Sequence, residues 1–321
     1  MIQIMKTDVW DAIKRKKITS REALEVEGRE IVLTNIEKEL WKGVTKAHLI
    51  AYYNTVAPFL LPYLEDRPLA LNISPDGPFK ESVFIRGLKG HYPTWAKIFH
   101  TERKHKMAGK SNIIDWLVCN DLATLIYMIN LDCIDLHPWS SRINSPDQPD
   151  YISIDLDPSD KDFGKAIETA RAAKELFDRY RIRSFIKTSG KTGLHIFIPC
   201  SSIPFGNARI LAENICKSIH QLVPTITTLE RSVSDRGNKL YIDPSQNDYS
   251  DRLAVAYCIR ANKLPTVSTP LEWKEVNSKL DPRKFLINTV PERLQKKGDL
   301  WKDLFSEKVR KANLKGIHSF V

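Results

Sequence analysis

The sequence predicts an α/β or α+β protein in which helices flank one central sheet, with a more helical N-terminal half packed against it as a second lobe. Two observations lead to this class. After residue 150, short runs rich in β-forming residues alternate with segments whose apolar residues recur at helical spacing. With 321 residues, 42% of them apolar, the chain can bury a full core as one large domain or two lobes in close contact.

Helices are predicted where apolar residues recur every three to four positions. This pattern runs over residues 46–64, 163–180 and 208–222. Strands are predicted at β-rich runs over residues 151–157, 183–188, 194–199, 239–243 and 253–260. Residues 1–30 carry little pattern and predict an extension, a short helix followed by a linker. We expect the rest to form one domain, with an N-terminal lobe over about 31–150, a sheet core over about 151–290 and a C-terminal helical tail over about 291–321.

Composition narrows the class of partner and compartment. The chain carries 49 Lys and Arg residues against 39 Asp and Glu, a formal net charge of +10. This excess favours nucleic acid as a partner, the alternative being charge that only maintains solubility. The five cysteines lack the paired spacings of a zinc site, so neither structural zinc nor a disulfide framework is expected. Without a signal-peptide pattern or an 18-residue apolar run, we expect a cytoplasmic protein with no membrane association.

Two aspartates mark the end of the strand predicted at residues 151–157. Asp155 and Asp157 share one face of this strand, and apolar residues alternate with them on the other. Neighbouring carboxylates repel each other unless a cation or a proton lies between them, and their hard oxygens suit Mg²⁺ or Mn²⁺. The pair therefore predicts a metal site, against the alternative that both acids lie on a solvated strand end or cap the following helix.

A third aspartate recurs in an equivalent place. Asp243 ends the run at residues 239–243 and, like Asp157, precedes a proline. If the two strands are neighbours, the three aspartates converge on two metal ions at one edge of the sheet. Such ions would polarise the phosphates of a nucleotide and lower the pKa of an attacking hydroxyl. The alternative is two unrelated strand ends with polar caps.

A glycine-rich basic segment, TSGKTGLHIFIP, spans residues 188–199. Its two glycines permit close approach of a ligand, Ser189 supplies a hydroxyl and Lys191 a positive charge. The Walker spacing is absent and the segment leads into a strand, so phosphate binding would depend on a hairpin loop. A lone strand histidine is more often structural, but the position of His195 beside this loop favours a triphosphate contact. No nucleophilic triad is evident, which disfavours hydrolysis through a covalent intermediate.

Taken in order, these segments resemble a known family. ISIDLDPSD, SGKTGLHIFIP, LYIDPSQND and AVAYCIRANKLPTVSTPLEW are similar to the polymerase domain of bacterial ligase D and its stand-alone relatives, in the archaeo-eukaryotic primase superfamily. VLTNIEKELW, VTKAHLIAYYNTVAPFLLPYLEDRPLAL, SPDG and NLDCIDLHPWSSR extend the resemblance over roughly residues 31–290. It implies a primase-polymerase core with a central mixed sheet, and a template-guided nucleotidyl transferase of non-homologous end joining. Such an enzyme fills gaps at broken DNA ends, prefers ribonucleotides and uses two Mn²⁺ or Mg²⁺ ions.

The resemblance also implies roles for single residues of this chain. Those at the metal ions are Asp155, Asp157 and Asp243; those at the incoming triphosphate are Ser189, Lys191, His195 and Arg260; those at its base and sugar are Phe84 and His137; those at the 5′-phosphate of the downstream DNA strand are Lys38 and Lys46; and Arg236 is at the template or the triphosphate. The alternatives to these functional roles are a core position for Phe84, solvated charges for the two lysines and a turn position for His137.

The implied partners are DNA with 5′-phosphorylated gaps or broken ends, ribo- or deoxyribonucleoside triphosphates, Ku and a separate ligase. Nothing in the resemblance requires more than a monomer. Two other classes stay open: a catalytically silent end-binding module that bridges Ku and ligase, and an Asp-x-Asp glycosyltransferase that uses a nucleotide sugar and Mn²⁺. The glycosyltransferase predicts no need for Asp243 and no affinity for 5′-phosphorylated gaps.

Overall fold

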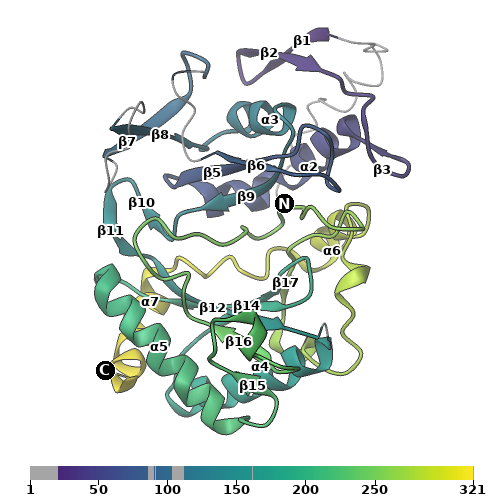
Figure 1. The fold of residues 1–321 in the computed structure, drawn as a ribbon. Helices are drawn as coiled ribbons and strands as arrows, with labels where there is room; N and C mark the ends of the chain where they lie inside the picture. The colour runs from purple at the N-terminus through teal and green to yellow at the C-terminus, as the bar shows by residue number, and fades with distance from the viewer. Residues whose placement is uncertain (1–20, 86–89, 91, 103–111, 161, 321) are drawn as a thin grey trace.

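Two halves, each built around its own β-sheet, stack on each other in the computed structural model (Figure 1). The structure describes residues 21–85, 90, 92–102, 112–160 and 162–320. Within these residues, no helix is both long and apolar enough to cross a membrane.

The upper half contains a five-stranded sheet. Its order is β6-β5-β8-β7, and β9 also pairs with β5. The strands are β5 Pro68–Ile73, β6 Val83–Ile85, β7 Lys97–Glu102, β8 Ile113–Val118 and β9 Cys133–Pro138. Helices α2 Lys46–Leu64 and α3 Leu122–Asn130 pack on it, and two hairpins precede them: β1 Arg21–Val26 with β2 Arg29–Thr34, and β3 Glu39–Trp41 with β4 Val44–Thr45. A third hairpin, β10 Ser141–Arg142 with β11 Ser145–Pro149, leads to the lower half.

The lower half is a mixed six-stranded sheet in the order β15-β16-β12-β14-β13-β17. The strands are β12 Tyr151–Pro158, β13 Phe185–Thr188, β14 Leu194–Pro199, β15 Thr227–Thr228, β16 Leu240–Asp243 and β17 Pro270–Leu271. All pairs are antiparallel except β15 with β16. Helices α4 Phe163–Arg179 and α5 Phe205–Leu222 pack against its apolar face, and the chain ends in α6 Val290–Lys297, α7 Glu307–Ile317 and a short 3-10 turn, His318–Phe320.

The alternation of β12 divides the core into two clusters. Ile152, Ile154 and Leu156 are fully buried against α4 and α5. On the opposite face Tyr151, together with Phe197 of β14, joins the hydrophobic cluster of the upper half. The sheet therefore presents the face that carries the aspartates toward the upper half.

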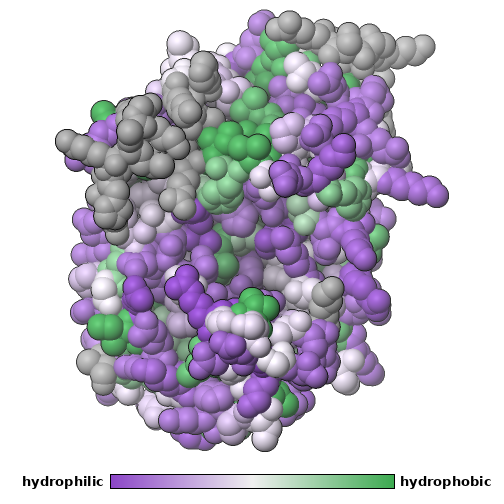
Figure 2. All heavy atoms as spheres, in the orientation of Figure 1, coloured by the Kyte–Doolittle hydropathy of each residue, from purple (hydrophilic) through white to green (hydrophobic). Residues whose placement is uncertain are grey.

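On the surface seen in the orientation of Figure 1, hydrophilic residues prevail over the lower part of the molecule, and a hydrophobic patch interrupts them in the upper part (Figure 2).

The predicted mixed sheet with flanking helices and a packed N-terminal lobe is confirmed, but three details are wrong. The N-terminal half is not mainly helical, since it also contains strands β6, β7 and β8. The sequence did not indicate these strands because they are short or half-exposed and show no clear alternation of apolar and polar residues. Residues 21–34 form a hairpin instead of a linker; the helix expected earlier in that extension lies outside the described residues. Residues 253–260 form no strand, only isolated bridges such as Ile259 to Val267.

Candidate active site

The strand register brings the three predicted aspartates to one place. On β12, Asp155 is paired with His195 of β14 on one side and with Asp243 of β16 on the other. Residues directly opposite in antiparallel strands point to the same face, and Asp157 follows two residues later on that face. Asp155 Oδ1 lies 3.4 Å from Nε2 of His195. The structure thus groups three acids and one imidazole on the sheet face that is turned toward the upper half.

Electrostatics show that this carboxylate group lacks a full counter-charge. Burial, together with the charges of Asp157 and Asp243, raises the pKa of Asp155 to about 7. Burial also raises the pKa of Asp157, although Arg236, whose Nη1 lies 3.7 Å from Asp157 Oδ2, works against this. Among the described residues, no group of three or more His, Cys, Asp and Glu side chains is arranged to hold a metal ion as the side chains stand. The fit to Mg²⁺ or Mn²⁺ depends on the donors themselves, hard carboxylate oxygens whose mutual repulsion a cation would relieve.

The loop between β13 and β14 is folded by its own serine. Ser189 Oγ accepts hydrogen bonds from the backbone N–H groups of Lys191 and Gly193, both at 3.0 Å. Gly190 has a positive φ of 75°, and a Cβ added there would lie 2.5 Å from Cγ of Arg260. A Cβ at Gly193 would lie 2.1 Å from the backbone oxygen of Leu156. Both glycines are therefore required by close packing, and the Ser189 hydroxyl keeps its own proton as a donor for a ligand.

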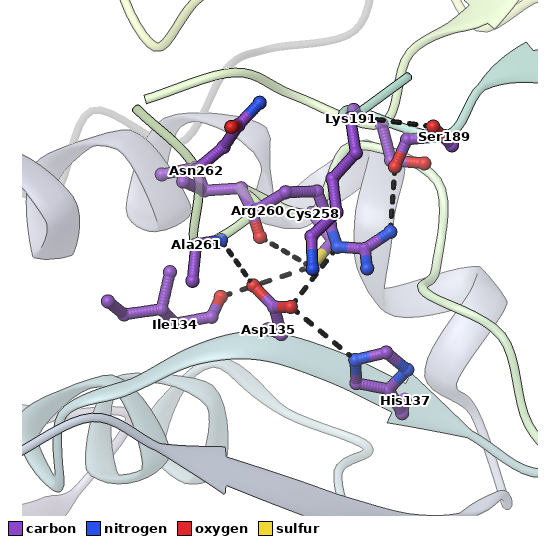
Figure 3. A network of polar contacts seen from close by, with 12 residues as sticks. Ile134, Asp135, His137, Ser189, Lys191, Cys258, Arg260, Ala261 and Asn262 are labelled. Atoms are coloured by element: carbon purple, nitrogen blue, oxygen red, sulfur yellow. Dashed lines mark hydrogen bonds and ion pairs between the residues drawn. The ribbon is translucent and has the colours of Figure 1, made fainter. Parts of the chain in front are cut away.

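A buried aspartate that the sequence analysis did not identify joins this loop to the upper half (Figure 3). Asp135 of β9 accepts hydrogen bonds from Arg260 Nε at 3.2 Å and from the backbone of Ala261 at 2.7 Å, and His137 Nε2 lies 3.7 Å away. Arg260 Nη1 in turn donates to the Ser189 carbonyl at 2.7 Å. Asp135 therefore fixes two predicted site residues together. Its signal in the sequence was the Asp-x-His spacing, which places both side chains on one face of a strand.

Lys187 is a second residue that the sequence analysis missed. Its ammonium is fully buried and lies 2.8 Å from Nδ1 of His195, and it also donates to the Ser268 hydroxyl. When Lys187 donates to Nδ1, the ring hydrogen of His195 lies on Nε2, the atom that points toward Asp155. Burial and the positive charge of Lys187 lower the pKa of His195 well below its usual value. Lys187 thus controls the tautomer of the predicted phosphate ligand.

The predicted base and sugar contacts lie side by side across β6 and β9. The rings of Phe84 and His137 are 6.1 Å apart in an edge-to-face arrangement, and the guanidinium of Arg252 lies 4.8 Å above the Phe84 ring. Phe84 is 44% exposed, which excludes the alternative of a simple core residue. Burial lowers the pKa of His137, against the opposing effect of Asp135, and so favours the neutral imidazole.

The two predicted 5′-phosphate ligands meet at one carboxylate. Lys38 Nζ lies 3.1 Å from Asp132 Oδ2, and Lys46 Nζ lies 3.4 Å from Asp132 Oδ1. Lys46 is only 1% exposed and also donates to the carbonyl of Asn130, so it is not a solvated helix-flanking charge. Near the acids, the guanidinium of Arg236 lies 4.0 Å from the Tyr241 ring centroid and donates to the carbonyls of residues 230 and 231.

The structure thus combines a mixed sheet, three aspartates on the neighbouring strands β12 and β16, a basic glycine loop and a buried histidine. The class of protein is a primase-polymerase domain. The chain belongs to the LigD primase-polymerase domain family, whose model matches residues 45–301. The family resemblance seen in the sequence is therefore confirmed.

Relatives and a solved structure agree with this membership. The bifunctional non-homologous end joining protein LigD of Bacillus subtilis is 32% identical over 274 residues, which are 84% of this chain and 43% of that protein. The multifunctional LigD of Mycolicibacterium smegmatis is 28% identical over 84% of this chain and 35% of its own length. The chain thus spans less than half the length of these relatives. The polymerase domain of Mycobacterium tuberculosis ligase D, solved in complex with DNA, matches with a TM-score of 0.77 at 24% identity over 86% of this chain and 98% of that one, which shows a shared fold.

Proposed function

We propose that this chain is a DNA-dependent nucleotidyl transferase that fills gaps at double-strand break ends in non-homologous end joining, with ribonucleotides preferred. The observation that carries the proposal is the convergence of Asp155, Asp157 and Asp243 opposite His195 and beside the glycine loop. The names of the relatives and the DNA complex of the solved homologue support the same reaction class.

In this proposal the three aspartates hold two Mn²⁺ or Mg²⁺ ions. When bound, such ions lower the pKa of a primer 3′-hydroxyl and stabilise the leaving pyrophosphate. Ser189, Lys191, His195 and Arg260 hold the incoming triphosphate from the loop side. Arg260 is fixed for this task, because Asp135 and the Ser189 carbonyl occupy two edges of its guanidinium. Arg236, close to Asp157, contacts the template or the triphosphate.

The proposed preference for ribonucleotides comes from His137. Its Nε2 is directed toward Asp135, which leaves the Nδ1 lone pair of a neutral ring as an acceptor for the sugar 2′-hydroxyl. We propose that Phe84, exposed beside it, stacks on the base with the face of its ring that the Arg252 guanidinium does not cover. A deoxyribonucleotide would leave this acceptor without its hydrogen bond.

The lysine pair lies next to strand β9, which carries Asp135 and His137. Asp132, which contacts both lysines, directly precedes this strand, three residues before Asp135. We propose that Lys38 and Lys46 bind the 5′-phosphate of the downstream strand beside the nucleotide pocket. We also propose that residues 31–321 act as one monomeric domain in the cytoplasm, with Ku and a separate ligase as partners.

The decisive experiment is extension of a primer across a one-nucleotide, 5′-phosphorylated gap with Mn²⁺, using ribo- or deoxyribonucleotides. We expect extension by the wild type and loss of it in Asp155→Ala, while Asp178→Ala, an exposed aspartate on α4, keeps full activity. Gap binding without extension by the wild type would favour the silent end-binding module. Equal activity of Asp155→Ala would move the catalytic centre elsewhere.

A further inference from the structure

The lysine pair of the proposed 5′-phosphate site already contains an anion. Asp132 contacts both Lys38 and Lys46, at 3.1 Å and 3.4 Å. Burial lowers the pKa of Lys46, against the opposing effect of Asp132, because an ammonium removed from water needs a compensating charge. The Lys38 side chain is 23% exposed and the Asp132 side chain 16%, so a ligand can reach them from solvent.

The backbone at this aspartate is unusual. Asp132 has a positive φ of 62°, a left-handed conformation that is uncommon for residues other than glycine, and its carbonyl accepts a hydrogen bond from Ser74 N–H at 2.9 Å. Aspartate adopts this conformation more readily than most residues do, and the hydrogen bond from Ser74 holds the backbone that carries the carboxylate between the two lysines.

We propose that Asp132 is a built-in competitor for the 5′-phosphate, and this inference depends on the proposed function. In the free protein its carboxylate neutralises the lysine charges that a terminal phosphate takes over on binding. A backbone phosphodiester carries one negative charge, the same as the carboxylate, so the exchange gains little. A terminal phosphate carries about 1.5 to 2 negative charges near pH 7 and therefore displaces the carboxylate from the lysines. Asp132 therefore weakens binding of the correct end and suppresses binding of ordinary DNA backbone at this site.

The test compares Asp132→Asn and Asp132→Gly, both of which tolerate a positive φ. Binding is measured by fluorescence anisotropy on one-nucleotide gaps that carry either a 5′-phosphate or a 5′-hydroxyl. We expect both variants to bind the phosphorylated gap at least about fivefold more tightly than the wild type, as for a modest coupling between two competing groups. Affinity for the 5′-hydroxyl gap should also rise above that of the control, because Asp132 no longer suppresses binding of the DNA backbone at the two lysines.

Asp66→Asn is the matched control. Asp66 also has a positive φ, 57°, and pairs with a different lysine, Lys97, at 2.6 Å. Like the Asp132 variants, Asp66→Asn removes one negative charge, so it reports the general electrostatic gain in DNA binding. As a second readout, the phosphorylated gap should raise the thermal midpoint of Asp132→Asn more than that of the wild type, since only the variant leaves the lysines without their internal anion.

Two outcomes separate the inference from the proposed function. If the wild type prefers the phosphorylated gap and both Asp132 variants bind it equally or more weakly, Asp132 only positions the lysines and the inference is overturned. If the wild type shows no preference for a 5′-phosphate, the proposed role of Lys38 and Lys46 fails and the inference fails with it. Metal-dependent extension, judged by Asp155→Ala, is independent of both results.

Discussion

Lys187 and His195 are directly paired across strands β13 and β14, and Lys187 Nζ lies 2.8 Å from Nδ1 of the imidazole. The contact is fully buried, and it leaves Nε2 directed at Asp155. An imidazole held from behind in this way presents one defined N–H to a ligand. The buried lysine is thus a positioning residue for the proposed triphosphate site.

Lys187→Met should therefore weaken nucleotide binding more than turnover. We expect the KM for the nucleotide to rise about tenfold, with a smaller change in kcat, because the His195 ring loses its fixed orientation. Steady-state gap filling measures both constants. Lys239→Met, which removes an exposed lysine that donates to the carbonyl of Pro224, is the control. In a His195→Ala background Lys187→Met should add little; full additivity of the two losses would contradict the coupling.

Gly193 should tolerate no side chain. A Cβ there would lie 2.1 Å from the Leu156 carbonyl of the neighbouring strand, so Gly193→Ala must separate β12 from β14 next to Asp155 and Asp157. We expect a loss of about 2 kcal/mol in the free energy of unfolding, as for overpacking, together with loss of extension. Gly206→Ala, at the start of α5 with nothing within 4 Å of the added carbon, should be neutral or slightly stabilising in the same urea titration. Equal effects of the two substitutions would show that the close approach does not exist in solution.

An ion-pair cluster near the C-terminal region makes stability depend on pH. Burial opposes ionisation of Glu275, but hydrogen bonds from Arg293 and Lys297 outweigh it and lower the Glu275 pKa from 4.5 to about 2. A carboxyl whose pKa is lower in the folded state stabilises the fold above pH 4.5, and this contribution is lost as the pH falls toward 2.

Glu275→Gln should remove that pH dependence. We expect the wild type to exceed the variant by about 1 to 2 kcal/mol in unfolding free energy at pH 7, after an allowance for solvent screening, and the difference to shrink between pH 4.5 and 2. Urea unfolding at a series of pH values measures it. Glu307→Gln, which removes the exposed partner of Lys311, should change little at any pH. A constant difference between wild type and Glu275→Gln across this range would be evidence against the assigned pKa.

The parts of the site that the sequence predicted are those that follow from strand alternation. Asp155, Asp157 and Asp243 end apolar strands, and a period of two residues places them on one face without knowledge of the rest of the fold. The partners of these residues depend on contacts between distant segments. Asp135 and Arg260 are 125 positions apart, and nothing local in either segment indicates that they pair.

The failed strand prediction at residues 253–260 has a local cause. This apolar run is buried as a central strand would be, but Tyr257 has a positive φ of 65°, which ends the extended conformation. The carbonyl of Tyr257 accepts from the Tyr52 hydroxyl, and its N–H donates to the Ser268 carbonyl. The run is therefore buried as irregular backbone between the halves, and side-chain hydroxyls replace part of a sheet ladder. Hydrophobicity alone does not distinguish these two solutions.

One aspartate connects the two halves and the C-terminal helix. Asp150, just before β12, accepts hydrogen bonds from Arg67, which directly precedes β5, from Arg142 Nε at 3.0 Å and from Arg310 Nη1 of α7 at 2.8 Å. The Arg67 side chain is fully buried, and its guanidinium lies 4.7 Å from the ring of Phe305. Burial opposes ionisation of Asp150. The positive charges of three guanidiniums outweigh it and keep the pKa of Asp150 below its usual value; in order of decreasing effect they belong to Arg67, Arg142 and Arg310.

Asp150→Asn should destabilise the whole chain strongly. The substitution leaves the buried Arg67 without its counter-charge, a loss of about 3 to 5 kcal/mol when one partner of a buried ion pair is removed. Arg310→Gln should cost less, because its side chain is 25% exposed and water can replace part of the lost interaction. Urea unfolding followed by tryptophan fluorescence measures both. Asp150→Asn should also lower the cooperativity of unfolding, because the two sheets would no longer unfold together. An unchanged single transition at wild-type stability would contradict this. It would show that packing of Tyr151 and Phe197 against the upper half is enough to hold the halves together.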